Sequence, residues 1–282
     1  MTIVVTGATG HFGRVAVESL LSRGVPADQI VAIGRSVEKI QDLADRGVRV
    51  IHASYEDPES LRKAFAGADK LLFVSGSEVG KRLEQHANVV AAAKDAGISK
   101  VVYTSAPYAD TSDMMIAVEH RATEQALAGS GIPDVHFLRN SWYLENYNVK
   151  GALEHGLFGA AGEGKISIAT RADLAEAAAA AVVADNLDKQ AYELGGEAVT
   201  LTELAAEVSR QSGQEVGYTN LPQEKYQEFL VGVGLPEQFA AVLADSDRGA
   251  SVGLLDTGAG DLAQLLGRPA TPLADAVRAE LA

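Results

Sequence analysis

The fold class of this chain is decided by the stretch IVVTGATGHFG, residues 3–13. A short apolar run rich in β-branched residues leads into three glycines spaced three residues apart, and a segment of helical period follows. This order predicts a buried strand, a tight turn and a helix whose N-terminal N–H groups face the turn. Such groups bind anions, so we expect the pyrophosphate of a dinucleotide here, the alternative being an ordinary glycine-rich turn. The predicted cofactor-binding residues of this turn are Gly7, Ala8, Thr9, Gly10, His11, Phe12 and Gly13.

Outward from this stretch, strand-like runs alternate with helix-like segments through the first half of the chain. Strands are expected at 3–6, 30–33, 48–51, 71–75, 101–105 and 135–138. Helices are expected at 11–23, 37–46, 58–66, 82–96 and 116–130. Alternation of this kind implies βαβ units with right-handed crossovers. The sequence therefore predicts an α/β fold with a doubly wound parallel sheet.

The second half has a different pattern, with few strand signals. Helices are expected near 223–233, 236–245, 258–266 and 272–281. We therefore expect a sheet domain over residues 1–150 and a smaller, mostly helical domain over residues 151–282, with some segments of the latter returning to the sheet domain.

The charge of the 282-residue chain is strongly acidic, because 24 Lys and Arg stand against 38 Asp and Glu to give a formal net charge of −14. An acidic protein repels phosphate backbones and anionic lipids, so we expect no nucleic-acid partner and no membrane insertion. No apolar run approaches the ~20 residues of a membrane helix. Strand-like residues begin at Thr2, which leaves no room for a signal peptide, so we expect a cytoplasmic protein.

Metal and thiol chemistry have no support in the sequence. Cysteine is absent, and the six histidines include no His-x-x-x-His pair. A disulfide framework, a thiolate metal site and a cysteine nucleophile are therefore excluded. We expect no metal site.

The end of the second expected strand bears on the choice of cofactor. A site for NAD places an acidic residue about 20 residues beyond the glycine turn, where its carboxylate binds the ribose 2′-hydroxyl. This chain has Gly34, Arg35 and Ser36 there. The planar guanidinium of arginine suits a 2′-phosphate, so Arg35 predicts NADPH, the alternative being a solvated surface arginine.

The usual catalytic pair of short-chain dehydrogenases is missing. None of the eight tyrosines is followed by lysine four residues later. In the helix where that pair is expected the chain carries His120, which is either close to the nicotinamide or on the helix surface. The catalytic residue is therefore unknown from the sequence, and reduction of ordinary ketones by the common route is disfavoured.

Several stretches together resemble one family, the NmrA-like atypical short-chain dehydrogenases. Within it the chain is most similar to the bacterial NADPH-dependent quinone oxidoreductases of type two, and next to the triphenylmethane dye reductases. The stretches that carry the resemblance are residues 7–10, 25–35, 77–80, 139–147 and 162–165. The resemblance implies a Rossmann domain, a small C-terminal domain and a cleft between them. One departure is Gly34, where the family more often has an apolar residue.

The resemblance also implies site residues at the ends of later strands. The cofactor ribose and nicotinamide would be flanked by Ser75, Gly76, Ser77, Thr104 and Ser105, and the nicotinamide would be lined by Asn140, Ser141, Trp142 and Tyr143. The acceptor pocket would comprise Asn140, Trp142, Tyr143 and Tyr147. Three aromatic residues within six positions also suit stacking on a flat acceptor, the alternative being a hinge core between domains.

The function we predict is hydride transfer from NADPH to a quinone or a similar planar, electron-poor acceptor. A quinone becomes aromatic on reduction, which lessens the need for a strong enzymic acid, so positioning would supply much of the catalysis. The alternative is a non-catalytic NADP(H)-sensing regulator of the NmrA type. An epimerase is disfavoured by the missing tyrosine. A homodimer is compatible with these expectations.

Overall fold

The structure is a computed structural model that describes all 282 residues, and the chain divides into two compact units. The first unit comprises Met1–Ser105, Glu119–Leu138 and Leu174–Tyr192, and the second comprises Ala106–Val118, Arg139–Asp173 and Glu193–Ala282. Each unit thus collects three separate segments. The predicted domains, residues 1–150 and 151–282, concern the parts of the chain that fold independently, and they stay a prediction.

A seven-stranded sheet confirms the doubly wound α/β fold. Its strands are β1 (Ile3–Val5), β2 (Ile30–Gly34), β3 (Arg49–His52), β4 (Lys70–Phe73), β5 (Lys100–Ser105), β6 (Asp134–Asn140) and β9 (Ala191–Leu194). They lie in the order β3-β2-β1-β4-β5-β6-β9, and the pairs among β1 to β5 are parallel. The order reverses at β1, which pairs with both β2 and β4. Ligands of such sheets bind beyond the carboxyl ends of the strands at this reversal.

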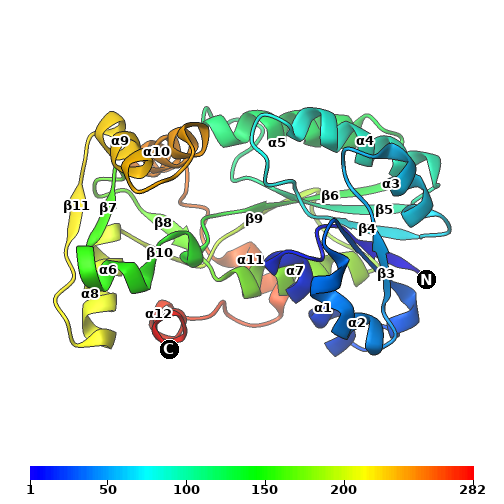
Figure 1. Ribbon diagram of the computed structural model, residues 1–282, viewed down its shortest axis with the longest axis horizontal. Coiled ribbons are helices and arrows are strands. Elements are labelled where there is room, and N and C mark those ends of the chain that lie inside the picture. The colour runs from blue at the N-terminus through cyan, green and yellow to red at the C-terminus, as the bar shows by residue number, and fades with distance from the viewer. The chain divides into compact units, whose positions relative to one another are not determined.

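Helices cover both faces of the sheet in the first unit. They are α1 (His11–Ser22), α2 (Gln41–Asp45), α3 (Pro58–Phe65) and α4 (Arg82–Asp95). The first two lie on one face and the other two on the opposite face (Figure 1). Because both faces are covered, β2 and β5 have no exposed residue, as their continuous apolar runs require. The expected helix 37–46 begins as the 3-10 helix η2 (Val37–Ile40) before it becomes α2.

Two helices, α5 (Met115–Ala128) and α7 (Arg171–Val183), begin in the second unit and end in the first. The other helices of the second unit are α6 (Val149–His155), α8 (Leu201–Ser212), α9 (Gln223–Gly232), α10 (Glu237–Ser251), α11 (Gly260–Leu266) and α12 (Leu273–Leu281). Its two-stranded sheets pair β8 (Ile166–Ile168) with β10 (Glu197–Val199), and β7 (Leu157–Gly159) with β11 (Tyr218–Asn220). Two 3-10 turns complete the chain, η1 (Ala27–Gln29) in the first unit and η3 (Leu144–Asn146) in the second. No helix combines the length and the apolar character needed to cross a bilayer.

The expected end of α10 at residue 245 is wrong by six residues. Asp245, Ser246 and Asp247 interrupt the apolar pattern, yet all three are buried within the helix. Asp245 accepts a hydrogen bond from the Met115 N–H at 2.6 Å, and Asp247 accepts one from the Ala160 N–H at 2.8 Å. Partners from other segments satisfy these carboxylates, so the helix continues.

Candidate functional site

The glycine turn joins β1 to α1, and two of its backbone N–H groups are hydrogen-bonded to backbone carbonyls. Gly7 has a φ of +63°, in the left-handed region that favours glycine. The Ala8 N–H donates to the Ile33 carbonyl at 2.9 Å, and the Gly10 N–H donates to the Gly7 carbonyl at 2.9 Å. Gly10 gives α1 no side-chain cap, and the first turn of α1 contains no acidic residue. No internal carboxylate therefore competes for an anion at this helix start.

The second and third glycines of the turn have different roles. A Cβ at Gly13 would lie 2.4 Å from the Gly7 carbonyl oxygen, so only glycine lets α1 start this close to the turn. A Cβ at Gly10 would meet only the same oxygen, at 3.4 Å, and would otherwise occupy open space. Open space above an uncapped helix fits the close approach of a pyrophosphate.

The departure at Gly34 has a local explanation. A Cβ at this position would lie 2.5 Å from the Thr9 hydroxyl oxygen. The Thr9 side chain therefore occupies the space that a larger residue would need at the end of β2. The glycine turn and the end of β2 can therefore pack against each other because residue 34 is a glycine.

Arg35 follows β2 and extends into solvent, with 61% of its side chain exposed. Its guanidinium does not stay unpaired, because Nη1 lies 2.6 Å from the Glu78 carboxylate. Glu78 is in the loop after β4, within the stretch 77–80 that carries the family resemblance, and is not among the predicted site residues. Arg35 is thus accessible to a ligand phosphate and already holds an anionic partner. Its exposure fits both a 2′-phosphate site and the alternative of a solvated surface arginine, so its role toward a cofactor stays a prediction.

The predicted residues at the ends of β4 and β5 are brought together in part. The Ser75 N–H donates to the Thr104 hydroxyl at 2.9 Å, and that hydroxyl donates to the Ser75 hydroxyl at 3.3 Å. The Ser105 hydroxyl instead donates to the Glu124 carboxylate at 2.6 Å. Adjacent strand ends thus place Ser75 and Thr104 side by side, whereas the Ser105 side chain bonds to α5.

A buried polar network anchors the loop after β4. The Gly76 N–H donates to His86 Nε2 at 2.9 Å, and the Gly76 carbonyl accepts from Arg82 Nε at 2.6 Å. Glu119 then accepts from the Gly80 N–H at 3.1 Å and from Arg82 at 3.3 Å. Both ends of the segment 76–80 are therefore held by buried or largely buried side chains of α4 and α5.

The tautomer of His86 follows from its partners. Nε2 accepts the Gly76 N–H, so the ring proton is on Nδ1, which donates to the Thr123 hydroxyl at 2.8 Å. Burial and the nearby Arg82 lower the pKa of His86 to about 3. The ring is therefore neutral in the folded protein at neutral pH.

His120 does not lie on the helix surface, so that alternative is wrong. Only 4% of the residue is exposed, and Nδ1 lies 2.7 Å from the Tyr103 hydroxyl. Burial lowers the pKa of His120 well below its usual value. The helical period could not identify this burial, because it depends on the Tyr103 side chain from β5.

Acidification below pH 6.5 is expected to reduce stability through His86. The unfolded chain binds the proton near pH 6.5 and the folded chain only near pH 3, so the contribution of neutral His86 is complete above pH 6.5 and declines as the pH falls toward 3. Between pH 7.5 and pH 5.5 this loss amounts to about 1 kcal/mol. Urea unfolding at each pH measures the slope.

The variant that checks this prediction is His86→Gln, whose side-chain oxygen can accept the Gly76 N–H bond without titrating. Its free energy of unfolding should fall less steeply with acid than that of the parent. His155→Gln replaces a histidine whose side chain is 73% exposed and should keep the parental slope. Identical slopes in all three proteins would contradict the role of His86.

The aromatic stretch after β6 lies in the second unit. Trp142 and Tyr147, each 7% exposed, belong to the hydrophobic core of that unit. Tyr143 accepts a hydrogen bond from Asn140 Nδ2 at 3.2 Å, and the Arg171 guanidinium lies 5.5 Å from its ring centre. The Ser141 hydroxyl donates to the Leu255 carbonyl at 3.1 Å. A core role for the two buried rings is therefore established, and their role toward a ligand stays a prediction.

Two buried polar atoms in the same stretch have no hydrogen-bond partner. They are Asn140 Oδ1 and the Tyr147 hydroxyl. An unpaired buried polar atom costs about 1–3 kcal/mol, so a ligand that pairs with it recovers that energy. Burial also raises the pKa of Tyr147 well above its usual range, which keeps the hydroxyl protonated and able to donate.

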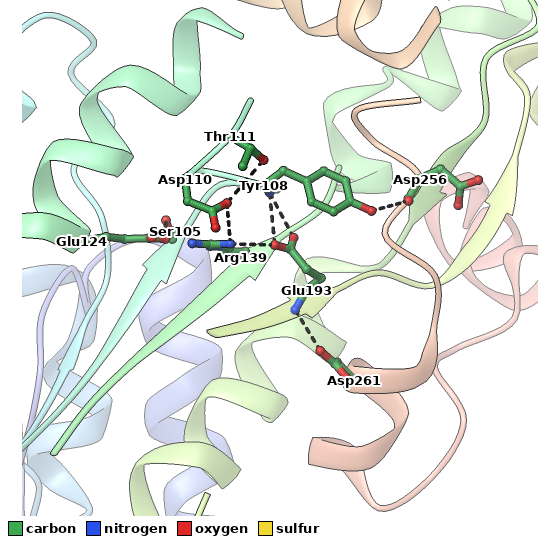
Figure 2. Close-up of polar contacts among 9 residues, drawn as sticks. All are labelled: Ser105, Tyr108, Asp110, Thr111, Glu124, Arg139, Glu193, Asp256 and Asp261. Atoms are coloured by element: carbon green, nitrogen blue, oxygen red, sulfur yellow. Dashed lines mark hydrogen bonds and ion pairs between the residues drawn. The ribbon is translucent and has the colours of Figure 1, made fainter. Parts of the chain in front are cut away.

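A second polar network surrounds Arg139 at the end of β6 (Figure 2). Its guanidinium donates to Asp110 at 2.9 Å and to Glu193 at 3.1 Å. The Glu193 carboxylate also accepts from the Tyr108 N–H at 3.1 Å, and the Tyr108 hydroxyl donates to the Asp256 carbonyl at 2.7 Å. Tyr108 has a φ of +47°, a strained value for a residue with a side chain. Bonds at both ends of Tyr108 therefore hold this conformation.

The parallel sheet with a glycine turn and an arginine after β2 defines a dinucleotide-binding protein of the Rossmann type. Residues 1–250 match the NmrA-like family, and the chain belongs to that family. It is 50% identical over 279 residues to quinone oxidoreductase 2 of Escherichia coli, a match that covers 98% of this chain and 97% of that protein.

Solved structures give the same quinone oxidoreductase and one further relative. The NADPH complex of the Escherichia coli quinone oxidoreductase QOR2 superposes with a TM-score of 0.92 at 48% identity and covers 98% of both chains. The NADP(H) complex of Citrobacter sp. triphenylmethane reductase gives a TM-score of 0.92 at 39% identity and covers 100% of both chains.

Proposed function

We propose that this protein is an NADPH-dependent oxidoreductase that transfers a hydride to a quinone or a similar planar, electron-poor acceptor. The observation that carries the proposal is the 50% identity to quinone oxidoreductase 2 along nearly the whole of both chains. The first unit supplies matching features: an uncapped helix start, open space at Gly10 and an accessible Arg35.

The cofactor residues in this proposal follow the strand ends. The pyrophosphate binds at residues 7–13 and Arg35 binds the 2′-phosphate. The N–H groups of Ala8 and Gly10 already donate to backbone carbonyls, so other N–H groups of this turn and of the start of α1 contact the pyrophosphate. Ser75 and Thr104, already paired with each other, contact the ribose and nicotinamide side. Bound NADPH supplies the hydride, and the protein supplies orientation.

The acceptor residues in this proposal belong to the second unit. Trp142 and Tyr143 present aromatic surface to a flat acceptor. The unpaired Asn140 oxygen offers an acceptor for an amide N–H, and the unpaired Tyr147 hydroxyl offers a donor to an oxygen that gains charge. A quinone becomes aromatic on reduction, so a hydrogen-bond donor can serve where other short-chain dehydrogenases use a tyrosine–lysine pair.

Three narrower points belong to the same proposal. We place the protein in the cytoplasm. We also propose that it has no nucleic-acid partner, because its formal net charge is −14. We also keep the homodimer as a proposal. Size-exclusion chromatography with light scattering tests the last point directly.

The proposed activity is tested by NADPH oxidation with menadione as the acceptor and no added flavin. We expect turnover well above the protein-free rate, with NADH a poorer donor. Binding of NADPH is measured in parallel by calorimetry. If NADPH binds and yet several quinones are reduced no faster than without protein, the alternative of an NADP(H)-sensing regulator of the NmrA type replaces the enzyme.

A further inference from the structure

The loop after β4 places a carboxylate against the arginine that the proposed function assigns to the cofactor. Glu78 Oε1 lies 2.6 Å from Arg35 Nη1, although the two residues are 43 positions apart in the chain. The proposed function assigns the 2′-phosphate of the cofactor to Arg35. Because Glu78 contacts the Arg35 guanidinium, it lies where the 2′-substituent of the adenosine ribose is expected.

The position of Glu78 is set by the fold. The Gly76 N–H and carbonyl are bonded to His86 and Arg82, and the Gly80 N–H is bonded to Glu119. These anchoring side chains are nearly buried, so only the three residues between the anchors are loosely constrained. The anchored backbone therefore keeps the Glu78 side chain within reach of Arg35.

Glu78 has a second cationic partner besides Arg35. Lys81 Nζ lies 3.0 Å from the Glu78 carboxylate and 3.4 Å from that of Glu56. Hydrogen bonds from Lys81 and from Arg35 both lower the pKa of Glu78, so it is charged at neutral pH. When Arg35 leaves, Lys81 still neutralises Glu78. The four side chains alternate in sign, from Arg35 through Glu78 and Lys81 to Glu56. Breaking the Arg35–Glu78 ion pair therefore costs little free energy, because Glu78 keeps Lys81 as a partner.

We propose that Glu78 is a specificity-determining residue that competes with the 2′-phosphate of NADPH for the Arg35 guanidinium. This inference rests on the proposed function. The phosphate must displace Glu78 before it pairs with Arg35, and the carboxylate left nearby repels it. NADH carries a 2′-hydroxyl, which has no charge to repel and can donate to the carboxylate. Glu78 thus lowers the preference for NADPH that Arg35 creates.

The experiment compares Glu78→Gln with Glu56→Gln by calorimetric titration at low ionic strength, where surface ion pairs are strongest. The probes are NADPH, NADH, 2′,5′-ADP and 5′-AMP. Glu78→Gln should bind NADPH and 2′,5′-ADP about three- to fivefold more tightly than the parent does, and should not gain affinity for NADH or 5′-AMP. Glu56→Gln loses the same type of contact with Lys81 but not with Arg35, and should match the parent.

A double variant separates the inference from the proposed function. In an Arg35→Ala background the gain from Glu78→Gln should largely disappear, because the competition needs the guanidinium. If Arg35→Ala weakens NADPH binding but Glu78→Gln leaves it equal to or weaker than in the parent, the inference on Glu78 is overturned and the proposed function stands. If Arg35→Ala has no effect on NADPH, the assignment of Arg35 fails first. Thermal melts verify that Glu78→Gln is folded.

Discussion

Replacement of Arg35 by alanine is expected to weaken NADPH binding by about 1.5–3 kcal/mol, roughly ten- to 150-fold in Kd. The variant would lose the charge-assisted, planar contact with the 2′-phosphate that we propose for Arg35. Because Arg35 exchanges one anionic partner, Glu78, for another on binding, the effect should fall toward the lower end of this range. Calorimetry at fixed salt measures it.

Two comparisons make this first prediction specific. NADH, which has no 2′-phosphate, should bind Arg35→Ala within threefold of its affinity for the parent. Arg62→Ala removes a half-exposed arginine of α3 that pairs with Glu59, and should leave NADPH affinity unchanged. An equal loss for NADH and NADPH would show that Arg35 acts on something other than the phosphate.

Replacement of Gly13 by alanine is expected to lower the free energy of unfolding by about 2–3 kcal/mol. The added Cβ would lie 2.4 Å from the Gly7 carbonyl oxygen and 2.8 Å from the Ala8 Cα, and backbone atoms cannot rotate away as a side chain can. The helix must shift away from the turn, which also misaligns its N–H groups for an anion. Urea unfolding measures the stability.

Gly10→Ala is the matched control for the second prediction. Its Cβ meets only one atom, at 3.4 Å, so the stability should change by less than about 1 kcal/mol. The same methyl group blocks the proposed approach of the pyrophosphate, so NADPH should bind at least about tenfold more weakly. A Gly13→Ala protein as stable as the parent would refute the close-packing argument, and a Gly10→Ala protein with parental NADPH affinity would refute the placement of the pyrophosphate.

The parallel sheet was predictable because its signals are local. Each strand of the first half is a run of apolar, often β-branched residues bounded by turn residues, and each helix between them has its own period. β1, α1 and the turn at Gly7 form within residues 3–22. The three-residue strands β7, β8 and β10 escaped prediction, whereas β1, of the same length, was found because the glycine turn follows it.

The polar contacts of the site were not predictable, since their partners are far apart in the chain. The charge of Glu78 resembles that of any loop residue until β2 and β4 bring Arg35 beside it. Arg139 belongs to a stretch that the sequence singled out, yet its partner Glu193 lies 54 residues away. The residues around His120 in the sequence predict a helix, and this pattern is compatible with either an exposed or a buried histidine. The contact with Tyr103 in the folded chain shows that His120 is buried.

By itself the sequence determined the alternation of strands and helices that implies a parallel α/β sheet, the glycine turn after β1 and the arginine after β2, because the signals for each lie in residues that are neighbours along the chain. The tertiary structure alone decided which charges meet: Glu78 on Arg35, Glu119 on Arg82 and Glu193 on Arg139. The physical reason is that an ion pair depends on distance in space, and the folded backbone sets that distance between residues that the linear order keeps apart.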